Sequence, residues 1–324
     1  GPYILKKWKG KYQFHYEAVS NYWDKRYLPQ IKTVIVNIIP EPTTRMAALV
    51  AGDVDFADSV SPQLITMAKA NPQVQVVAVP SSRTCYLYPI IKKGSPWANV
   101  KVRQAVNYAL DKDALVNTVL EGYGRVIPTN VGPDSYGFNP ALKPYPYNPA
   151  KAKKLLSEAG YGKGISTEIW MPLGRYLKGK AVAEAMVNML SKVGIKAKLK
   201  VAEWGVVKKR MKARWKPKVK SFLRMGCRMD SNLHSEHMYA GTIHSRSTWG
   251  GFREKWMDNL IDDARATVDD AKRLKKYQEV NKVIHEKAIM GFLYQQHQVV
   301  AKNKRLNYTP RTNGFVIPAE LSLK

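Results

Sequence analysis

The chain has 324 residues, 45% of them hydrophobic, and its 53 Lys and Arg against 25 Asp and Glu give a net charge of +28. This length supports a large core and indicates two domains, while the charge favours attraction to anionic partners without specifying a fold. No run of about 18 apolar residues is present, which excludes a spanning helix. The sequence opens at Gly1-Pro2-Tyr3 without a charged-then-apolar leader, so either a leader has been removed or the chain begins inside a longer protein.

Strands and helices alternate in the first eighty residues. The continuous apolar run VIVNII (34–39) is typical of a strand buried on both faces. The next segment, TTRMAALVAG (43–52), predicts a helix with a threonine cap and a closing glycine. Short strands are expected at VDFA (54–57) and VQVVAV (74–79), with a helix opening at Ser61-Pro62 between them.

The middle of the chain predicts capped helices. VRQAVNYAL (102–110) places its apolar residues on one helical face, and Asp111 can cap the next helix, which ends at Gly122. NPAKAKKLLSEAG (148–160) has an asparagine cap, a proline at the first helical position and a closing glycine. These segments predict three consecutive helices.

The remaining chain switches between the helical and the strand period. AVAEAMVNMLSKVG (181–194) predicts a helix, and IKAKLKVAEW (195–204) predicts a strand whose lysines face outward. DDAKRLKKYQEVNKVIHEKA (269–288) predicts a long final helix, and FLYQQHQVVA (292–301) predicts a strand. This alternation indicates an α/β architecture.

The segment 208–230 is unusually basic, with ten Lys and Arg and one acid, Asp230. Its pattern predicts a helix that starts near Gly205 and is broken at Pro217, followed by a strand in which Val219, Ser221, Leu223 and Met225 alternate with Lys218, Lys220, Phe222 and Arg224. We therefore expect most of these basic residues to form a solvated face. The zinc-finger, phosphate-loop and RNA-recognition motifs that accompany nucleic-acid binding do not occur in the sequence.

The two cysteines, Cys85 and Cys227, have no metal-type spacing and cannot form a disulfide framework. Two buried free thiols are the expectation. A disulfide between them is the alternative.

Several motifs, in order, resemble the extracytoplasmic solute-binding proteins of the peptide/nickel class that feed ABC importers (family 5). GPY (1–3) and NYWDKRYLPQIKTVIVNIIPEPTTRMAALVAGDVDFA (21–57) are similar to the N-x-x-Y-W and T-T-R-x-A-A-L-x-x-G-x-V-D segments of that family. Further similarities lie in VPSSRTCYLYP (79–89), VKVRQAVNYALDKDALVNTVLEGYGRVIPT (100–129), YPYNPAKAKKLLSEAGY (145–161) and IDDARATVDDAKRLKKYQEVNKVIHEKA (261–288). The resemblance covers nearly the whole chain.

The resemblance implies a two-lobed periplasmic-binding-protein-like fold of type II, with mixed sheets and crossover strands. Residues 1–89 and 296–324 would form part of lobe one, and residues 90–295 would form lobe two. Family members also carry a substantial segment before the GPY motif, which this sequence lacks; whether it is cleaved or never made is open. The ligand would be enclosed as the lobes close about the crossover strands.

The resemblance also implies a ligand site. Many family members bind the ligand's amino group through an aspartate in a W-G-x-D-Y-P-D-P-D-N-like stretch. The corresponding MGCRMDSNLH (225–234) keeps Gly226, Asp230 and Asn232 but has Met225 and Arg228 where a tryptophan and an acid often stand. The basic neighbours favour a ligand with a carboxylate, since a guanidinium binds one bidentately. An internal ion pair between Asp230 and Arg228 is the structural alternative.

Other candidate residues come from the same comparison. Trp204 in AEWG would face the cleft, and Arg175 in GRY would reach the ligand, although a core tryptophan and a surface arginine fit equally well. Arg83, Tyr86 and Tyr88 lie on the strand that leaves the first lobe and would wall the cleft, unless they serve only strand packing.

Metal binding and catalysis have weaker support. His234, Glu236, His237 and His244 are clustered in the sequence, but no third ligand is fixed beside the two histidines at i, i+3. No nucleophile elbow, HExxH motif or spaced carboxylate pair occurs. We therefore expect no metal, no cofactor and no enzymatic activity.

The resulting hypothesis is a solute receptor of an ABC importer that binds a peptide or a related amino- or carboxylate-bearing solute. Its partner would be a membrane permease, its location extracytoplasmic and its state monomeric. The basic face could also contact anionic lipid or another polyanion. The alternative is a structural or nucleic-acid-binding protein built on the same fold with a degraded ligand site, which the net charge of +28 motivates.

Overall fold

The computed structural model describes residues 1–10 and 12–324 and divides into two compact units. Unit 1 comprises Gly1–Val79 and Gln298–Lys324, and unit 2 comprises Pro80–His297. Two long strands, β5 (Val74–Pro89) and β10 (Gly291–Asn303), cross the boundaries between the units. The first boundary lies at 79/80 rather than at the expected 89/90, because residues 83–89 of β5 pair with a strand of unit 2.

Unit 1 contains a three-stranded antiparallel sheet of β1 (Tyr3–Lys9), β2 (Gln13–Ala18) and β3 (Thr33–Asn37). The expectation that β3 is buried on both faces is wrong. It is the last strand in the order β1-β2-β3, and most of its side chains are exposed. An apolar run is therefore not sufficient evidence of a central strand.

The first helix of unit 1, α1 (Pro42–Ala51), begins and ends near the expected residues. Its cap, however, is Glu41 and not a threonine: the Glu41 carboxylate accepts a hydrogen bond from the Thr44 amide at 2.6 Å. Gly52 ends the helix at φ +86°, a conformation that favours glycine. The other short elements of unit 1 are β4 (Phe56–Ala57), α2 (Ile65–Ala70), β11 (Leu306–Asn307), β12 (Ser322–Leu323) and the 3₁₀ turns Lys25–Tyr27, Pro62–Leu64 and Pro318–Glu320.

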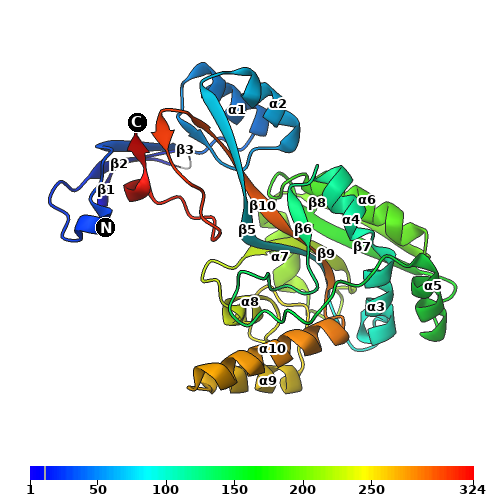
Figure 1. The fold of residues 1–324 in the computed structure, drawn as a ribbon. Coiled ribbons are helices and arrows are strands. Elements are labelled where there is room, and N and C mark those ends of the chain that lie inside the picture. Colours follow the sequence, from blue (N-terminus) through cyan, green and yellow to red (C-terminus); the bar gives the residue numbers. More distant parts are fainter. Residues whose placement is uncertain (11) are drawn as a thin grey trace. The chain divides into compact units, whose positions relative to one another are not determined.

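Unit 2 is built on a mixed sheet with strand order β10-β5-β9-β7-β8, in which β6 also pairs with β10 (Figure 1). The strands that belong wholly to this unit are β6 (Gly124–Val126), β7 (Ile165–Pro172), β8 (Ile195–Ala202) and β9 (Leu223–Met229). The strand β7 runs parallel to β8 and β9, and β5 runs antiparallel to β9. The strand β9 thus has a neighbour on each side, with β5 paired along its whole length and β7 paired at Leu223 and Arg224.

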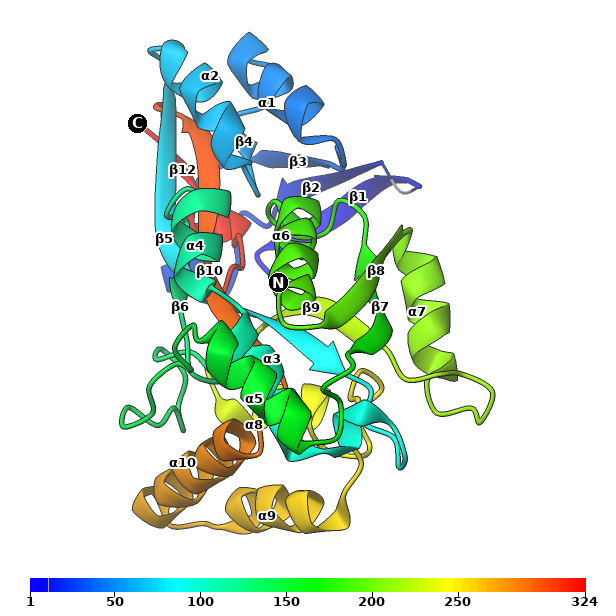
Figure 2. The same ribbon diagram turned by 90° about the vertical axis from the view of Figure 1, so that its right-hand side faces the viewer.

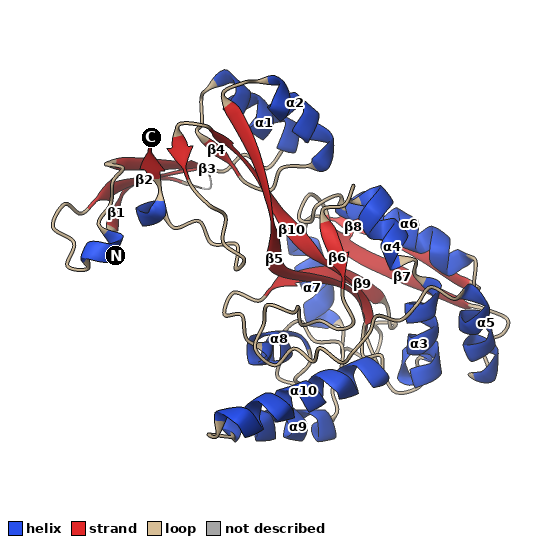
Figure 3. Cartoon of the chain, viewed as in Figure 1, coloured by secondary structure: helices blue, strands red, loops and turns tan. Residues whose placement is uncertain are grey.

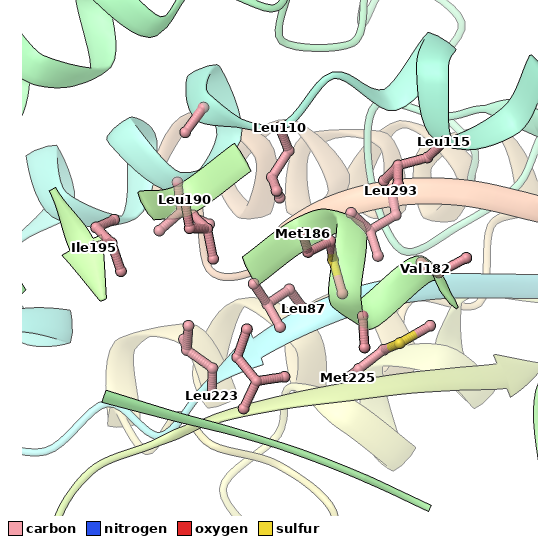
Figure 4. Packing of buried hydrophobic residues seen from close by; sticks show 14 of the residues in the cluster. Leu87, Leu110, Leu115, Val182, Met186, Leu190, Ile195, Leu223, Met225 and Leu293 are labelled. Carbon is pink, nitrogen blue, oxygen red and sulfur yellow. The ribbon is translucent and has the colours of Figure 1, made fainter. Parts of the chain in front are cut away.

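Helices cover both faces of this sheet (Figures 2 and 3). One core cluster joins the sheet to α3, α5 and α6, and includes Leu223 and Met225 of β9 beside Met186 and Leu190 of α6 (Figure 4). A second cluster joins the opposite face to α7, α8, α9 and α10. The helices are α3 (Val100–Ala109), α4 (Lys112–Ala114), α5 (Pro149–Glu158), α6 (Gly179–Ser191), α7 (Trp204–Ala213), α8 (Ser235–Thr242), α9 (Lys255–Ala266) and α10 (Asp270–Glu286), with a π-helical turn at Leu115–Val119 and a 3₁₀ turn at Pro96–Ala98.

Local signals located the helices of unit 2 well. Asn148 and Asp111 are the caps that the sequence predicts, accepting hydrogen bonds at 2.9 Å from the amides of Lys151 and Ala114.

In the part of the chain that the structure describes, none of the helices combines the length and apolarity needed to cross a bilayer.

Cys85 and Cys227 form a disulfide, so the expectation of two free thiols is wrong. The two residues are 142 positions apart in sequence but stand directly opposite each other in the antiparallel pairing of β5 and β9. The strand register, which the spacing of the cysteines does not reveal, brings the sulfurs together.

The basic stretch forms the predicted helix, α7, followed by β9, but the expected solvated face fails at Arg214, which is 4% exposed, and at Arg224. Arg224 was expected on a solvated face, whereas only 4% of its surface is exposed. The reason is that β9 is an inner strand with core clusters on both faces, so its first four residues, of either parity, are buried.

Other buried cations of unit 2 donate hydrogen bonds to backbone carbonyls. The Lys112 ammonium donates to the carbonyl oxygens of Asn107, Leu110 and Tyr145 at 2.7, 3.2 and 2.8 Å. Arg103 and Arg214 each donate to several carbonyls in the same way. Each of these side chains connects separate segments of the chain by donating to carbonyls on more than one of them.

We predict that replacing both cysteines with alanine lowers the free energy of unfolding by about 3 kcal/mol, because the disulfide restricts the unfolded chain across a long loop. Urea unfolding followed by circular dichroism measures this change. A reductant should lower the midpoint of the wild-type protein and leave that of the double variant unchanged. Equal sensitivity of the two proteins would contradict a disulfide.

We predict that Lys112→Met lowers the free energy of unfolding by about 3 kcal/mol, because buried carbonyls lose their donor. Burial lowers the pKa of Lys112 to about 8 from 10.5. The unfolded chain therefore binds more protons between these pH values, so the wild type should gain stability over that range and the variant should not. Urea midpoints measured at pH 7.5 and at pH 10 test both points, with the exposed Lys163→Met as the matched control.

Candidate ligand-binding site

Several candidate residues follow the carboxyl ends of the parallel strands in the unit 2 sheet, a region we call the carboxyl edge. The parallel strands β7, β8 and β9 end at Pro172, Ala202 and Met229. Arg175 lies in the loop after β7, Trp204 opens the helix after β8, and Asp230 directly follows β9. In open α/β sheets, ligands bind outside the carboxyl ends of the strands. The edge therefore carries groups from three separate segments at the expected place for a ligand.

Asp230 is the most unusual group at this edge, with only 1% of its surface exposed. Its Oδ2 accepts a hydrogen bond from the Ser135 hydroxyl at 2.6 Å. Within residues 1–10 and 12–324, its Oδ1 has no hydrogen-bond partner. A buried carboxylate oxygen without a donor is costly, which is the condition expected where a ligand supplies the donor.

The loop that supplies Ser135 is fixed to the segment after β9. The backbone amide of Tyr136 donates to the carbonyl of Leu233 at 2.8 Å, and the amide of Ser235 donates to the carbonyl of Tyr136 at 2.9 Å. Leu233 has φ +52°, a left-handed conformation that is rare for a leucine and costs about 1 kcal/mol. This turn holds Asp230 beside Ser135. No sequence signal identifies Ser135 as part of the site.

Arg228 does not pair with Asp230, so the internal ion pair considered from the sequence is wrong. Among the described residues, the ion pairs include none that involves Arg228. Its Nη2 lies 3.2 Å from Nε2 of His237, and its half-buried side chain packs against Gly241 of α8. The guanidinium is thus positioned by a helix and is not neutralised by an acid.

Trp204 belongs to an ordered series of rings and guanidinium groups. Its ring stacks on Trp249 with the centroids 5.0 Å apart, and the exposed Arg175 lies 4.3 Å above the Trp204 ring. The Arg224 guanidinium lies 5.9 Å from the centroid of the Trp249 ring. This series connects the surface of unit 2 with its buried cations, and Trp249 is a member that the sequence did not identify.

The remaining candidates differ in position. Tyr86 and Gly226 are direct partners in the pairing of β5 and β9 and share a face with Arg224 and Arg228. Tyr88 lies on that face too, but its hydroxyl donates to the buried carbonyl of Thr242. Met225 lies on the opposite face, inside the first core cluster (Figure 4), which leaves its side chain no route to a ligand at this edge. The half-buried Arg83 pairs with Met229 in the strand register.

Asn232 lines a shallow depression of about 400 Å³ beside the turn. The other lining residues are His234, Glu236, His237, Arg265, Arg273 and Tyr277. The histidines of this region take separate partners: His234 stacks on Tyr136, His237 contacts Arg228 and His244 contacts Asp258 and Asp262. Burial lowers the pKa of His234 below its ordinary value.

Among the described residues, no three His, Cys, Asp or Glu side chains are grouped so that they could hold a metal ion.

Comparison with known proteins agrees with this architecture. The model of the bacterial extracellular solute-binding proteins, family 5 (middle), matches residues 1–219. The chain belongs to this family. The family is one of solute-binding proteins, in agreement with the expectation that the chain is not an enzyme.

Individual relatives are similar over most of this chain. It is 34% identical to the dipeptide-binding protein of Escherichia coli K12 over 298 residues, which cover 89% of this chain and 54% of that protein. It is 30% identical to heme-binding protein A of Haemophilus influenzae over 291 residues, with 89% and 52% covered. The chain therefore spans about half of the length of these relatives.

A solved structure shares the fold. The ABC transporter-associated periplasmic binding protein DppA from Helicobacter pylori, in complex with the peptide STSA, superimposes with a TM-score of 0.85 at 22% identity. The similarity covers 100% of this chain and 62% of that one. The expected fold class, a type II periplasmic-binding-protein-like α/β fold with mixed sheets, is confirmed.

We predict that Ser135→Ala lowers the free energy of unfolding by about 2 kcal/mol, because it removes a hydrogen bond to a buried carboxylate. Urea unfolding measures the change, and the double variant with Asp230→Asn completes a mutant cycle. The loss caused by Ser135→Ala should shrink in the Asp230→Asn background. An equal loss in both backgrounds would show that the two side chains do not interact.

Proposed function

We propose that this protein is the solute receptor of an ABC importer and binds a peptide or a related solute that carries amino and carboxylate groups. The observation that carries the proposal is the buried Asp230 carboxylate, whose Oδ1 has no hydrogen-bond donor among the described residues. A ligand ammonium group supplies both the missing donor and the compensating charge. Such a charge-assisted hydrogen bond is about twice as strong as a neutral one.

Arg175 supplies the complementary charge. Its exposed guanidinium lies over the Trp204 ring, which holds the plane of the guanidinium in place and leaves its edge available to a carboxylate. Asp230 and Arg175 thus give opposite charges to one edge of the sheet, a pattern that suits a zwitterionic ligand. The relatives named for dipeptide and glutathione binding support this solute class.

The proposal extends to partner and location by family membership. We place the protein outside the cytoplasm, as a monomer that delivers its solute to a membrane permease. The family description, extracellular solute-binding proteins, supports this placement.

Native mass spectrometry of the protein as isolated, from low to high salt, is the first test. A small solute or peptide retained at high salt supports the receptor and identifies its ligand, because a buried charge pair is weakly screened. The alternative remains that the net charge of +28 binds nucleic acid. Nucleic acid carried at low salt and shed at high salt by an otherwise empty protein would overturn the proposal.

We predict that Asp230→Asn and Arg175→Gln each weaken binding of Ala-Ala by about 10- to 100-fold, the value of a hydrogen bond to a charged group. Isothermal titration calorimetry measures the affinities. Lys196→Gln, which changes an exposed lysine of β8, should bind the dipeptide as the wild type does. Wild-type affinity in both site variants would exclude this edge as the ligand site.

A further inference from the structure

Arg224 differs from the other buried arginines of unit 2. Arg103 and Arg214 donate to backbone carbonyls, as described above, and so does Lys112. Arg224 is as buried as Arg214, with 4% of each exposed, but its Nε has no hydrogen-bond partner within the described ranges. Its side chain is also absent from the ion pairs formed there. Its contacts are the Trp249 ring and the Tyr86 hydroxyl, which are both neutral, so the buried guanidinium lacks an acidic partner among the described residues.

A second cation without an acidic partner among the described residues lies on the same face of β9, the half-buried Arg228, which contacts His237. Residues of alternating position share a face of a strand, so Arg224, Gly226, Arg228 and Asp230 follow one another along it. The Arg228 Nε also has no hydrogen-bond partner among the residues described. The two arginines therefore flank Gly226, and Asp230 follows at the end of the row.

The missing side chain of Gly226 makes room for the Arg224 guanidinium. A Cβ at residue 226 would lie only 2.6 to 3.1 Å from the Arg224 guanidinium atoms. The absence of a side chain thus allows the guanidinium to lie over Gly226, in the direction of Arg228. An anion placed there would meet both cations.

The neighbouring tyrosine does not neutralise the pair. The Tyr86 hydroxyl faces the Arg224 guanidinium, and both arginines favour ionisation of the hydroxyl. Burial nevertheless raises the pKa of Tyr86 to about 12, so this hydroxyl is neutral at physiological pH and can only donate or accept a hydrogen bond. Arg214 is a third buried cation near this face: its charge opposes the burial that raises the pKa of Tyr88, and burial together with the charge of Arg224 lowers the pKa of Arg214.

We propose that Arg224 and Arg228 receive an acidic side chain of the ligand, so that the receptor selects peptides that contain Glu or Asp. The inference rests on the proposed function, because it places the ligand along β9 with its ammonium at Asp230. Because Arg228 is only half-buried, a ligand carboxylate can approach the two arginines past its side chain.

The spacing along β9 fits a short peptide. Two residues of a strand span about 6.6 Å, so the Arg228 position lies about 7 Å and the Gly226 position about 13 Å from Asp230. A carboxylate in this range belongs to a side chain or to the carboxyl terminus of a di- or tripeptide. Comparing Glu with Gln at each position, with a free carboxyl terminus throughout, separates these two sources.

The test is calorimetric titration with Ala-Ala-Ala and its six single Glu and Gln derivatives. We expect at least one Glu peptide to bind about tenfold more tightly than its Gln counterpart. In Arg224→Met this ratio should fall to within twofold of unity, in Arg224→Lys it should be intermediate, and in the exposed-lysine control Lys196→Met it should equal that of the wild type. A wild-type ratio near one at every position, or an unchanged ratio in Arg224→Met, would overturn the proposal.

A second readout separates ligand recognition from a structural role. Replacing a buried cation that has no acidic partner with an apolar residue of similar volume should leave the urea midpoint of the empty protein unchanged or raise it. A lower midpoint, together with an unchanged Glu-to-Gln ratio, would assign Arg224 to the fold alone. If Arg224→Met does not fold, Arg228→Met is measured by the same ratio with the same expectation.

The two proposals fail in different ways. If no tripeptide binds, with or without an acidic residue, the receptor function fails. If tripeptides bind but Glu and Gln are not distinguished, only the selection of acidic peptides fails.

Discussion

The position of β9 between β5 and β7 is the constraint on which the rest of unit 2 depends. It gives the strand two buried faces of opposite chemistry. The odd-numbered residues Leu223, Met225 and Cys227 enter the apolar core and the disulfide, while the even-numbered residues carry the cations and lead to Asp230. A slip of one residue in the pairing would exchange these faces and bury three charged groups among leucines and methionines. The register of one strand therefore sets the core, the covalent link and the candidate site together.

A feature of the fold could be predicted from the sequence when it depends on neighbouring residues, and could not when it depends on distant ones. Helix boundaries are local: an Asn or Asp cap and a glycine in the left-handed conformation act within one turn, and Asn148, Asp111 and Gly52 are where the sequence places them. Burial of a strand is not local. The sequence predicts β3 as buried on both faces, but β3 is the last strand of its sheet. It predicts one solvated face for β9, but β9 lies between β5 and β7. The pairing of Cys85 with Cys227 depends on the same long-range arrangement.

The candidate site shows the same division. Asp230, Trp204 and Arg175 follow directly after strands, so recognisable segments brought them to one edge. Ser135 and Trp249 come from irregular loops, and only the folded chain places them beside Asp230 and Trp204. Met225, although it lies in the motif of the site, points into the core, because its position on β9 is odd. Motifs identify the segment, but strand parity decides which of its side chains can face a ligand.

The large positive charge acts in two physically distinct ways. Exposed lysines such as Lys196 and Lys198 lie on β8, the last strand of its sheet, where charge opposes pairing with another strand. Their attraction for anions extends over roughly 8 Å at physiological salt and is screened beyond that distance. Arg224 is screened far less, because it is buried, and the half-buried Arg228 is intermediate. Surface lysines can raise the rate at which any anion arrives, whereas the Arg224–Arg228 pair can discriminate against a neutral isostere, since that ligand would give neither cation an acidic partner.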